Sequence, residues 1–499
     1  MCRLLLAAIC CGCAHAAVIG GVVLDGSTGR PLARSLVTLK PVAGAAAKTF
    51  SVRANRGGEF TFSSVDGGFY LVSASRNGFA PFQYGQRDWK AAGKPMAVEP
   101  GGKLFLDIRL HRYGAISGTV LDENETGIPD QRVVVYRAKT PLEVAGGGLT
   151  DERGMYRIHG LEPDTYYVRT VAKELEDGSG LVPTFHKEVS ALEQALTVEV
   201  NLDQEVEGID IRPLPGKLVH VSGEVANVPP VAAAVTLISD VGRVETRTSK
   251  AFRFDGVAPG QYELIAEGDD PYGHGRLGSY REMFVDKDLD DVRVQLTSLP
   301  ETEFRLVDGN GNHIDAAKAK ILARRKNLDG PSPTQDLTLV KDRATLGPGR
   351  WEIAIIPPAG YYAAAFSGPG FADSERGRAD GWNVVLLRYG QPVQFKLSSR
   401  PASIHGRVNG SGQDPVPGAP VYLEAFDQDA RQRLTELRTT RSDIRGQYHF
   451  NGLAPGVYRI LSSFEFEKPD SQAMEAAGAR TVALSEGAEN AQDLELYVR

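Results

Sequence analysis

One short motif recurs through the whole chain and defines the unit that folds. Its clearest copy lies in residues 150–166, where an acidic residue and a glycine precede two alternating apolar residues, a Gly-Leu pair, a proline and a tyrosine. The other copies are Asp443, Gly446, Tyr448, Phe450, Gly452, Leu453, Pro455, Gly456 and Tyr458; Phe252, Phe254, Gly256, Val257, Pro259, Gly260 and Tyr262; Gly58, Phe60, Phe62, Val65, Gly67, Gly68 and Tyr70; and a copy longer by one residue, Gly349, Trp351, Ile353, Ile356, Pro358, Gly360 and Tyr361. Such self-similarity indicates a tandem array of domains.

The motif itself predicts a strand, a turn and a second strand. Apolar residues alternate at Tyr156 and Ile158, which is the period of a strand with one buried face. Proline in the turn fixes its own φ, and a following glycine can take a positive φ. The motif therefore predicts a β-hairpin or a tight β-arch. In the last copy we expect Gly452, Pro455 and Gly456 to form a tight turn between paired strands.

Further recurrent pieces flank each copy of the motif. A Gly-x-Val strand such as Gly118–Val120 lies upstream, and an alternating run such as Leu494 and Leu496 lies downstream, which gives about six or seven short strands per unit. Helical periodicity is confined to short stretches around 190–195 and 472–477. The predicted fold class is all-β, a tandem array of about five small antiparallel β-sandwich domains. The predicted boundaries are a leader at 1–16 and sandwiches at 17–113, 114–215, 216–299, 300–400 (divergent) and 401–499.

These residues resemble the carboxypeptidase regulatory-like domain, a transthyretin-like sandwich that overlaps with the carbohydrate-binding-like fold. The resemblance is strongest over 115–172 and 403–462, weaker over 18–110 and 220–297, and weakest over 301–398. It implies a bacterial protein whose domains are non-catalytic accessory or adhesive modules. The motif specifies turn chemistry and a fold, and a fold alone does not fix an activity.

The first residues predict export. Arg3 precedes an apolar run, and Ala14, His15 and Ala16 form a small-x-small site, so we expect a secretory signal cleaved after Ala16. A lipoprotein signal, with Cys10, Cys11 or Cys13 modified, is the alternative. The four cysteines, Cys2, Cys10, Cys11 and Cys13, all lie in this leader. We expect a secreted or periplasmic protein without disulfides and with no transmembrane segment after signal removal.

Charge and motifs exclude several classes of function. Removal of Arg3 leaves 55 basic and 63 acidic residues, a mild net charge of −8 that does not suit nucleic acid. The mature histidines lack zinc-site spacing, and we expect His159 and His449 to be hydrogen-bonded or solvent-facing. Two acidic stretches, 286–291 and 308–312, leave calcium open, although solvated turns explain both. With no nucleophile motif either, the sequence predicts no enzyme, no cofactor and no metal.

Aromatic residues give the one candidate ligand site. Phe79, Phe82, Tyr84 and Trp89 crowd into a segment that follows the motif of the first unit and should form a surface loop. Sugars bind to flat aromatic faces beside hydrogen-bonding side chains. The alternative is that these rings cap the sandwich against a neighbouring domain. Trp351 should lie in a core, while Trp382 fits either role.

The sequence thus predicts an exported, non-catalytic, multi-domain binding protein. Its partner would be a glycan or a cell-surface or periplasmic protein. A structural spacer or an assembly or adhesion protein is the alternative, and for a spacer the short linkers predict a semi-rigid rod or bent rod. An accessory part of a hydrolase or peptidase system is a more remote alternative.

Overall fold

The computed structural model describes residues 16–42, 48–139, 142–175, 178–226, 233–240, 242–270, 275–299, 301–370, 381–387, 391–427 and 437–499. The predicted leader at 1–16, with its four cysteines, therefore lies outside the described residues except for Ala16. The chain forms five β-sandwich units, each with its own apolar core. This confirms the all-β tandem array. Among the helices of the described residues, none is long and apolar enough to cross a membrane.

The first two units show the common plan of a small sheet facing a larger one. In the first unit, the small sheet has the order β4 (Glu59–Val65), β1 (Ala17–Asp25) and β8 (Lys103–Leu110). The larger sheet contains β3 (Phe50–Arg53), β2 (Leu36–Pro41) and β5 (Gly68–Ser75), with β6 (Phe82–Gln83) and β7 (Met96–Val98) both pairing with β5. In the second unit, the sheets are β12 (Met155–Leu161), β9 (Gly114–Thr119) and β17 (Glu205–Val206), and β11 (Glu143–Leu149), β10 (Arg132–Arg137), β13 (Asp164–Thr170) and β16 (Val198–Val200). A short pair, β14 (Lys173–Glu174) and β15 (Gly180–Leu181), and the 3-10 helix η1 (Leu192–Gln194) complete that unit.

The remaining units repeat the plan. The third has β21 (Ala251–Val257), β18 (Val219–Ala226) and β24 (Leu289–Gln295), and β20 (Gly242–Thr248), β19 (Ala233–Ser239), β22 (Gly260–Asp269), β23 (Arg276–Val285) and β25 (Thr297–Ser298). The fourth has β30 (Arg343–Thr345), β26 (Glu301–Val307), β34 (Val393–Ser398) and β32 (Tyr362–Ser367), and β28 (Gly330–Pro331), β27 (Lys320–Asn327), β31 (Gly349–Ile356) and β33 (Asn383–Leu387), with β29 (Gln335–Asp336) on β27 and the 3-10 helix η2 (Ala316–Lys318). The fifth has β38 (Gln447–Leu453), β35 (Ala402–Asn409), β41 (Glu489–Ala491) and β42 (Leu494–Glu495), and β37 (Arg438–Arg441), β36 (Pro420–Ala425), β39 (Gly456–Ser462) and β40 (Arg480–Leu484), with the helix α2 (Ser471–Ala476). The first strand of every unit runs parallel to a late strand of that unit, while most other pairs are antiparallel.

The motif turn is an arch that joins the two sheets. In the fifth unit, β38 pairs with β35, whereas β39, which begins three residues later, pairs with β36 and β40 in the other sheet. The expected tight turn between paired strands is therefore wrong, and the arch is the alternative that holds. Gly452 has a φ of +70° and Gly456 a φ of +148°, which helps the chain leave one sheet and enter the other.

An aromatic side chain fixes this arch in all five units. Its hydroxyl or indole N–H donates to the carbonyl four residues earlier. The five bonds are Tyr70 to Asp66 (3.0 Å), Tyr166 to Glu162 (2.6 Å), Tyr262 to Ala258 (2.7 Å), Trp351 to Gly347 (2.8 Å) and Tyr458 to Ala454 (2.8 Å). Each ring is buried in its core, and a buried polar atom of this kind requires a partner.

The fourth copy of the motif is displaced from the register expected from sequence. Trp351 was aligned with the strand before the turn, but β31 pairs with β27 and β33 in the larger sheet, as the strand after the arch does in other units. The arch is therefore Leu346 to Gly349, and Trp351 takes the place of the motif tyrosine. The preceding strand, β30, has only three residues and lacks the alternating aromatic pair, so the copy is not recognisable there. Trp351 is nevertheless a core residue, as expected.

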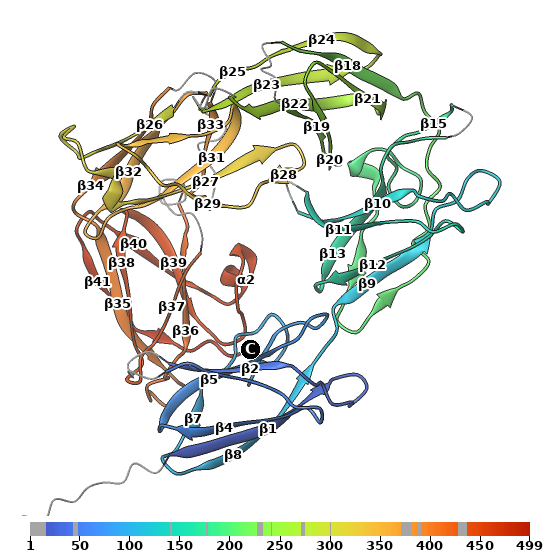
Figure 1. Cartoon of the computed structure of the whole chain (residues 1–499). Coiled ribbons are helices and arrows are strands. Elements are labelled where there is room, and N and C mark those ends of the chain that lie inside the picture. The colour runs from blue at the N-terminus through green and yellow to red at the C-terminus, as the bar shows by residue number, and fades with distance from the viewer. Residues whose placement is uncertain are drawn as a thin grey trace, which may run out of the picture.

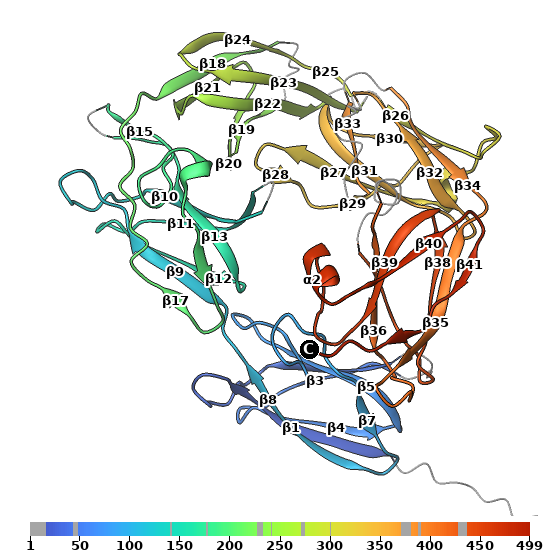
Figure 2. The ribbon, with the colours of Figure 1, turned by 180° about the vertical axis from the view of Figure 1, so that it is seen from behind.

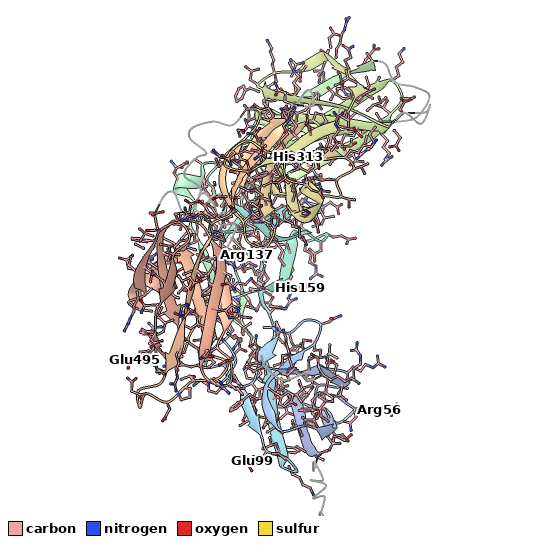
Figure 3. All side chains as sticks on the ribbon, turned by 90° about the vertical axis from the view of Figure 1, so that its left-hand side faces the viewer. Arg56, Glu99, Arg137, His159, His313 and Glu495 are labelled. Carbon is pink, nitrogen blue, oxygen red and sulfur yellow. The ribbon has the colours of Figure 1, made fainter. Side chains whose placement is uncertain are left out.

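The five units are arranged in a closed ring (Figures 1 and 2). The larger sheets, built on β2, β10, β19, β27 and β36, lie toward the middle, and α2 projects to the inner side of the fifth unit (Figures 1 and 2). Seen edge-on, the first and third units lie at opposite ends of the molecule and the fifth unit lies beside the first (Figure 3). The chain curves until its end domains meet, so the array is neither the rod nor the bent rod expected of a spacer.

Candidate functional site

The first two residues of the predicted aromatic site belong to the packing of the first unit. Phe79 is only 6% exposed and lies in the first core, with the guanidinium carbon of Arg112 4.8 Å from its ring centroid. Phe82, on β6, is half-buried and packs against the same core. The prediction that Phe79 lies in a surface loop is wrong. The start of the segment still packs on the sandwich, and the chain reaches the surface only at later residues.

Tyr84 and Trp89 lie nearer the surface. Tyr84 is 37% exposed, and its backbone N–H donates to the carbonyl of Val72 at 2.8 Å. Trp89 is half-buried, with the Lys90 ammonium 5.6 Å from its ring centroid. Among the described residues, no ring contact joins Tyr84 to Trp89 or either of them to Phe79 or Phe82. The sugar platform at these two residues stays a prediction.

The same segment carries the contact that closes the ring. The Ala92 N–H donates to the Phe464 carbonyl (2.9 Å), and the Glu467 N–H donates to the Lys90 carbonyl (2.5 Å). Backbone bonds of this kind fix the two segments in register with each other. Ala92 is fully buried and packs into the core of the fifth unit. The first unit thus inserts part of its own chain into the last one.

Side chains extend this closure on both sides. Arg87 pairs with Glu465 at 3.0 Å, and the Gln83 amide donates to Glu467 at 3.3 Å. Arg441 donates to the Gly418 carbonyl at 2.8 Å and reaches the Gly93 carbonyl at 3.5 Å. Burial lowers the pKa of Arg441. These partners lie about 350 to 380 residues apart in the chain. Alternation of apolar residues within one strand therefore cannot predict these contacts.

A clamp of charged groups joins the first unit to the second. The Asp203 carboxylate accepts from the Arg112 backbone N–H at 2.7 Å and lies 2.5 Å from the His111 ring. Arg112 also donates to Asp25 at 2.8 Å. Burial by itself would raise the pKa of Asp25, but hydrogen bonds from Ser27, Thr28 and Arg112 outweigh it and hold that pKa well below its usual range.

The second and third units meet around Arg169. Its guanidinium donates to Asp240 at 2.9 Å and stacks 4.7 Å from the centroid of the buried Phe185 ring. Arg169 and Asp240 border a cavity of about 200 Å³, whose walls include Tyr262 of the third arch. The neighbouring His186 ring is held by the Asp210 carbonyl at 2.7 Å. Phe185 and His186 therefore act in packing at this junction.

The third and fourth units share the most strongly charged junction. Glu267 lies 2.5 Å from Arg325, whose guanidinium also covers Trp351 at 5.2 Å from the ring centroid. Arg243 makes a bidentate salt bridge with Asp329, with nitrogen–oxygen distances of 2.8 and 2.9 Å. A cavity of about 390 Å³ lies between these pairs.

A buried carboxylate lies beside those pairs. Glu263 accepts from the Tyr280 hydroxyl at 2.9 Å and from the Leu328 N–H at 3.1 Å. Burial raises the pKa of Glu263. Arg350 donates to the nearby Glu282 at 2.9 Å, so residues of both units surround these acids.

The fourth and fifth units meet at Glu486. Its carboxylate accepts from the Ser398 hydroxyl at 2.6 Å and from the Tyr362 hydroxyl at 3.3 Å. These two bonds lower the pKa of Glu486. With this contact, each unit of the ring is bonded to both of its neighbours.

The other sequence candidates lie apart from these junctions. Asp288 and Asp290 bind the His220 ring at 3.2 and 2.6 Å, and Asp308 accepts from the backbone of its own turn at Asn310 and Asn312. In the part of the chain that the structure describes, no three His, Cys, Asp or Glu side chains gather as metal ligands would. Trp382 is buried beneath Arg324, whose guanidinium carbon lies 4.2 Å from its ring centroid.

One family model matches the first unit. The family model of the carboxypeptidase regulatory-like domain matches residues 18–111, nearly the whole span from β1 to β8. The first unit is therefore similar to a carboxypeptidase regulatory-like domain along nearly its whole length. The matched residues lie in the first unit, although its copy of the motif is one of the weaker copies in the sequence. No curated protein matches the chain.

Several solved structures are similar to parts of the chain. The Bacillus anthracis TIE protein is 13% identical with a TM-score of 0.19, over 56% of this chain and 50% of that one, so the chain spans half the length of that protein. A minor pilin of Streptococcus agalactiae is 14% identical with a TM-score of 0.25, over 40% of this chain and 97% of that one. The shaft pilin SpaA of Lactobacillus rhamnosus GG is 11% identical with a TM-score of 0.24, over 41% and 99%.

Proposed function

We propose that the protein is an exported, non-catalytic assembly protein, in which five sandwich domains form a rigid ring that binds a protein of the cell exterior. The observation that carries the proposal is the closure between the first and fifth units. A spacer needs its two ends far apart, whereas here the end domains bond to each other through Ala92 and Phe464. A closed ring instead holds the loops of five domains in fixed relative positions, which suits simultaneous contact with a partner.

The junctions support rigidity in the rest of the ring. Polar contacts between neighbouring units are short, as at Glu267 with Arg325 and Asp203 with Arg112, and the first of these pairs is half-buried. Domains joined only by flexible linkers would move independently. Export is supported by the leader pattern at residues 1–16.

Binding to cell envelopes tests this function. Labelled protein is added to envelopes of the source organism after two treatments, protease digestion or periodate oxidation of glycans. We expect protease to abolish binding and periodate to leave it unchanged. Binding that survives protease but is lost after periodate would contradict the proposal and favour a glycan.

Glycan binding is the second candidate, and the partial exposure of Tyr84 favours it. Tyr84 and Trp89 stand in the same segment as Asp88, an exposed carboxylate of the kind that bonds to sugar hydroxyls, whereas the Gln83 and Gln86 amides already donate to Glu467 and Ala91. Replacing both rings with Ala should weaken retention on a polysaccharide gel by about 1 to 3 kcal/mol and leave the melting temperature nearly unchanged, if they form a sugar platform. A lower melting temperature with unchanged retention would mean that the rings only cap the closure.

A further inference from the structure

Two histidines lie directly opposite each other on the outer sheet of the fifth unit. His405 on β35 pairs with His449 on β38. The Gln492 N–H donates to the His405 carbonyl at 2.8 Å, so the backbone of His405 faces the strand on its other side. His405 and His449 are therefore a non-hydrogen-bonded pair, the kind in which facing side chains come closest, with Cβ atoms about 4.5 to 5.5 Å apart.

Both imidazoles are exposed to solvent, and within the described residues neither has a hydrogen-bond or ion-pair partner. Four other histidines differ in this respect. His111, His220 and His313 each lie against an aspartate, at 2.5, 2.6 and 2.8 Å. His186 lies against a carbonyl. The ring nitrogens of His405 and His449 are thus available to a ligand from solution.

Other residue types occupy the equivalent cross-strand position in the first three units. The matching cross-strand pairs are Gly20 with Thr61, Ser117 with Arg157, and Ser222 with Arg253. Arg157 and Arg253 are each engaged by a carboxylate, Glu205 and Asp255 respectively. The paired imidazoles are therefore not a requirement of the fold at this position.

We propose that His405 and His449 form a two-histidine site for a divalent transition-metal ion on the face of the fifth unit. Neutral imidazole is a preferred ligand of Cu²⁺, Ni²⁺ and Zn²⁺, and affinity at such a site rises toward Cu²⁺. Adjacent cross-strand rings can supply two nitrogens to one ion. The remaining coordination positions stay open to water or to a ligand of another molecule.

Charged groups on this face modulate the site. Glu489 on β41 lies beside Ser403 in the parallel register and attracts a cation, while Arg407 lies two residues along β35 and repels it. Asp493 accepts from the backbone of Arg407 at 2.8 Å and adds negative charge at that end. Gln447 and Asn451, which flank His449 on β38, are uncharged. Because only neutral imidazole binds the ion, protons compete with the metal and binding should weaken as the pH falls.

Calorimetric titration with Ni²⁺ and Cu²⁺ electron paramagnetic resonance test the site in the full chain, with the four cysteines replaced by serine so that thiols cannot compete. We expect one Ni²⁺ per chain at pH 7.5, and a Cu²⁺ spectrum with splitting from two nitrogens. His405→Ala and His449→Ala should each weaken Ni²⁺ binding at least tenfold, and the double variant should be little weaker than either single one. His159→Ala and His313→Ala are the matched controls, since both residues are exposed on other units (Figure 3).

The controls should bind Ni²⁺ as the parent does. Binding that is unchanged in both His405→Ala and His449→Ala would overturn the proposal, as would loss of binding in His159→Ala or His313→Ala. Absence of heat at pH 7.5 together with a Cu²⁺ spectrum lacking two-nitrogen splitting would also overturn it.

Discussion

The junction of the third and fourth units and the closure of the fifth unit on the first hold domains together by different means. The junction uses side-chain charges that are largely withdrawn from water, such as Arg325 with Glu267. The closure uses backbone bonds and one inserted small residue, Ala92, and its ion pair of Arg87 with Glu465 has a 62% exposed arginine. Domains that follow each other in sequence are already close, so their contacts mainly set orientation, whereas the closure must form between distant parts of the chain.

The largest effect should follow from breaking the charged junction. Arg325→Ala removes the partner of Glu267 and the cover of Trp351, and we expect it to lower the free energy of unfolding of the third and fourth units by about 2 to 3 kcal/mol, because a partly buried carboxylate loses a partner. Arg276, at 3.3 Å, remains beside Glu267 and limits the loss. Arg305→Ala, which removes an exposed pair with Glu303, is the control and should cost well under 1 kcal/mol. Equal effects in urea unfolding would contradict the comparison.

The fifth unit can be weakened without touching either region. Gly456 has a φ of +148°, which a β-branched residue adopts only with strain. Gly456→Val should therefore destabilise the fifth unit by about 1 kcal/mol or more. Thermal unfolding of the full chain should show an earlier first transition, with the transition of the third and fourth units unchanged. A melting profile identical to that of the parent would mean that the arch tolerates a side chain there.

The stability of the junction between the third and fourth units should depend on pH in a defined direction. Burial raises the pKa of Glu263 above 4.5, its value in an unfolded chain, so the folded state holds this proton more tightly. The resulting stability is fully present below pH 4.5 and is lost as pH rises through the raised pKa. Glu263→Gln should therefore gain urea resistance relative to the parent between pH 4 and pH 8. A constant difference across that range would show that Glu263 does not titrate with folding.

The smallest effect should come from the exposed pair at the closure. Arg87→Ala should change stability by less than 1 kcal/mol, because an exposed ion pair is screened by water and salt. Its effect should vanish in 1 M NaCl, which shortens the screening length to about 3 Å. Urea unfolding of the parent and of Arg87→Ala at low and at high salt measures the difference in their free energies of unfolding. A loss of more than 2 kcal/mol would mean that the closure depends on charge after all.

Sequence alone predicted the repeats and the all-β class because both depend on local period. Alternating residues such as Tyr448 and Phe450 identify strands, and the turn residues mark where they end. The predicted helices also appear, as η1 and α2. The fourth copy was misplaced because its turn, Leu346 to Gly349, follows a strand too short to show alternation. The same turn residues are compatible with a hairpin and with an arch. Only the pairing of the two strands with distant strands distinguishes one from the other.

The candidate site depended on information that a local pattern does not hold. Phe79 and Tyr84 belong to one aromatic run, yet one is in a core and the other at the surface, since the chain turns back between them. The closure at Ala92 and the pair of His405 with His449 join residues far apart in sequence. The closure follows from the curvature of the whole array, whereas the histidine pair follows from the register of β35 with β38 inside the fifth unit.

Small-angle X-ray scattering of the chain and of Ala92→Glu tests the central claim, closure of the ring. The variant places a carboxylate in the core of the fifth unit near Glu465 and Glu467, and Ala97→Glu, at an exposed position on β7, is the control. We predict that the parent and Ala97→Glu share one maximum dimension, that of a closed ring, and that Ala92→Glu has a larger one with an unchanged circular dichroism spectrum. A parent protein as long as the opened variant would contradict the account.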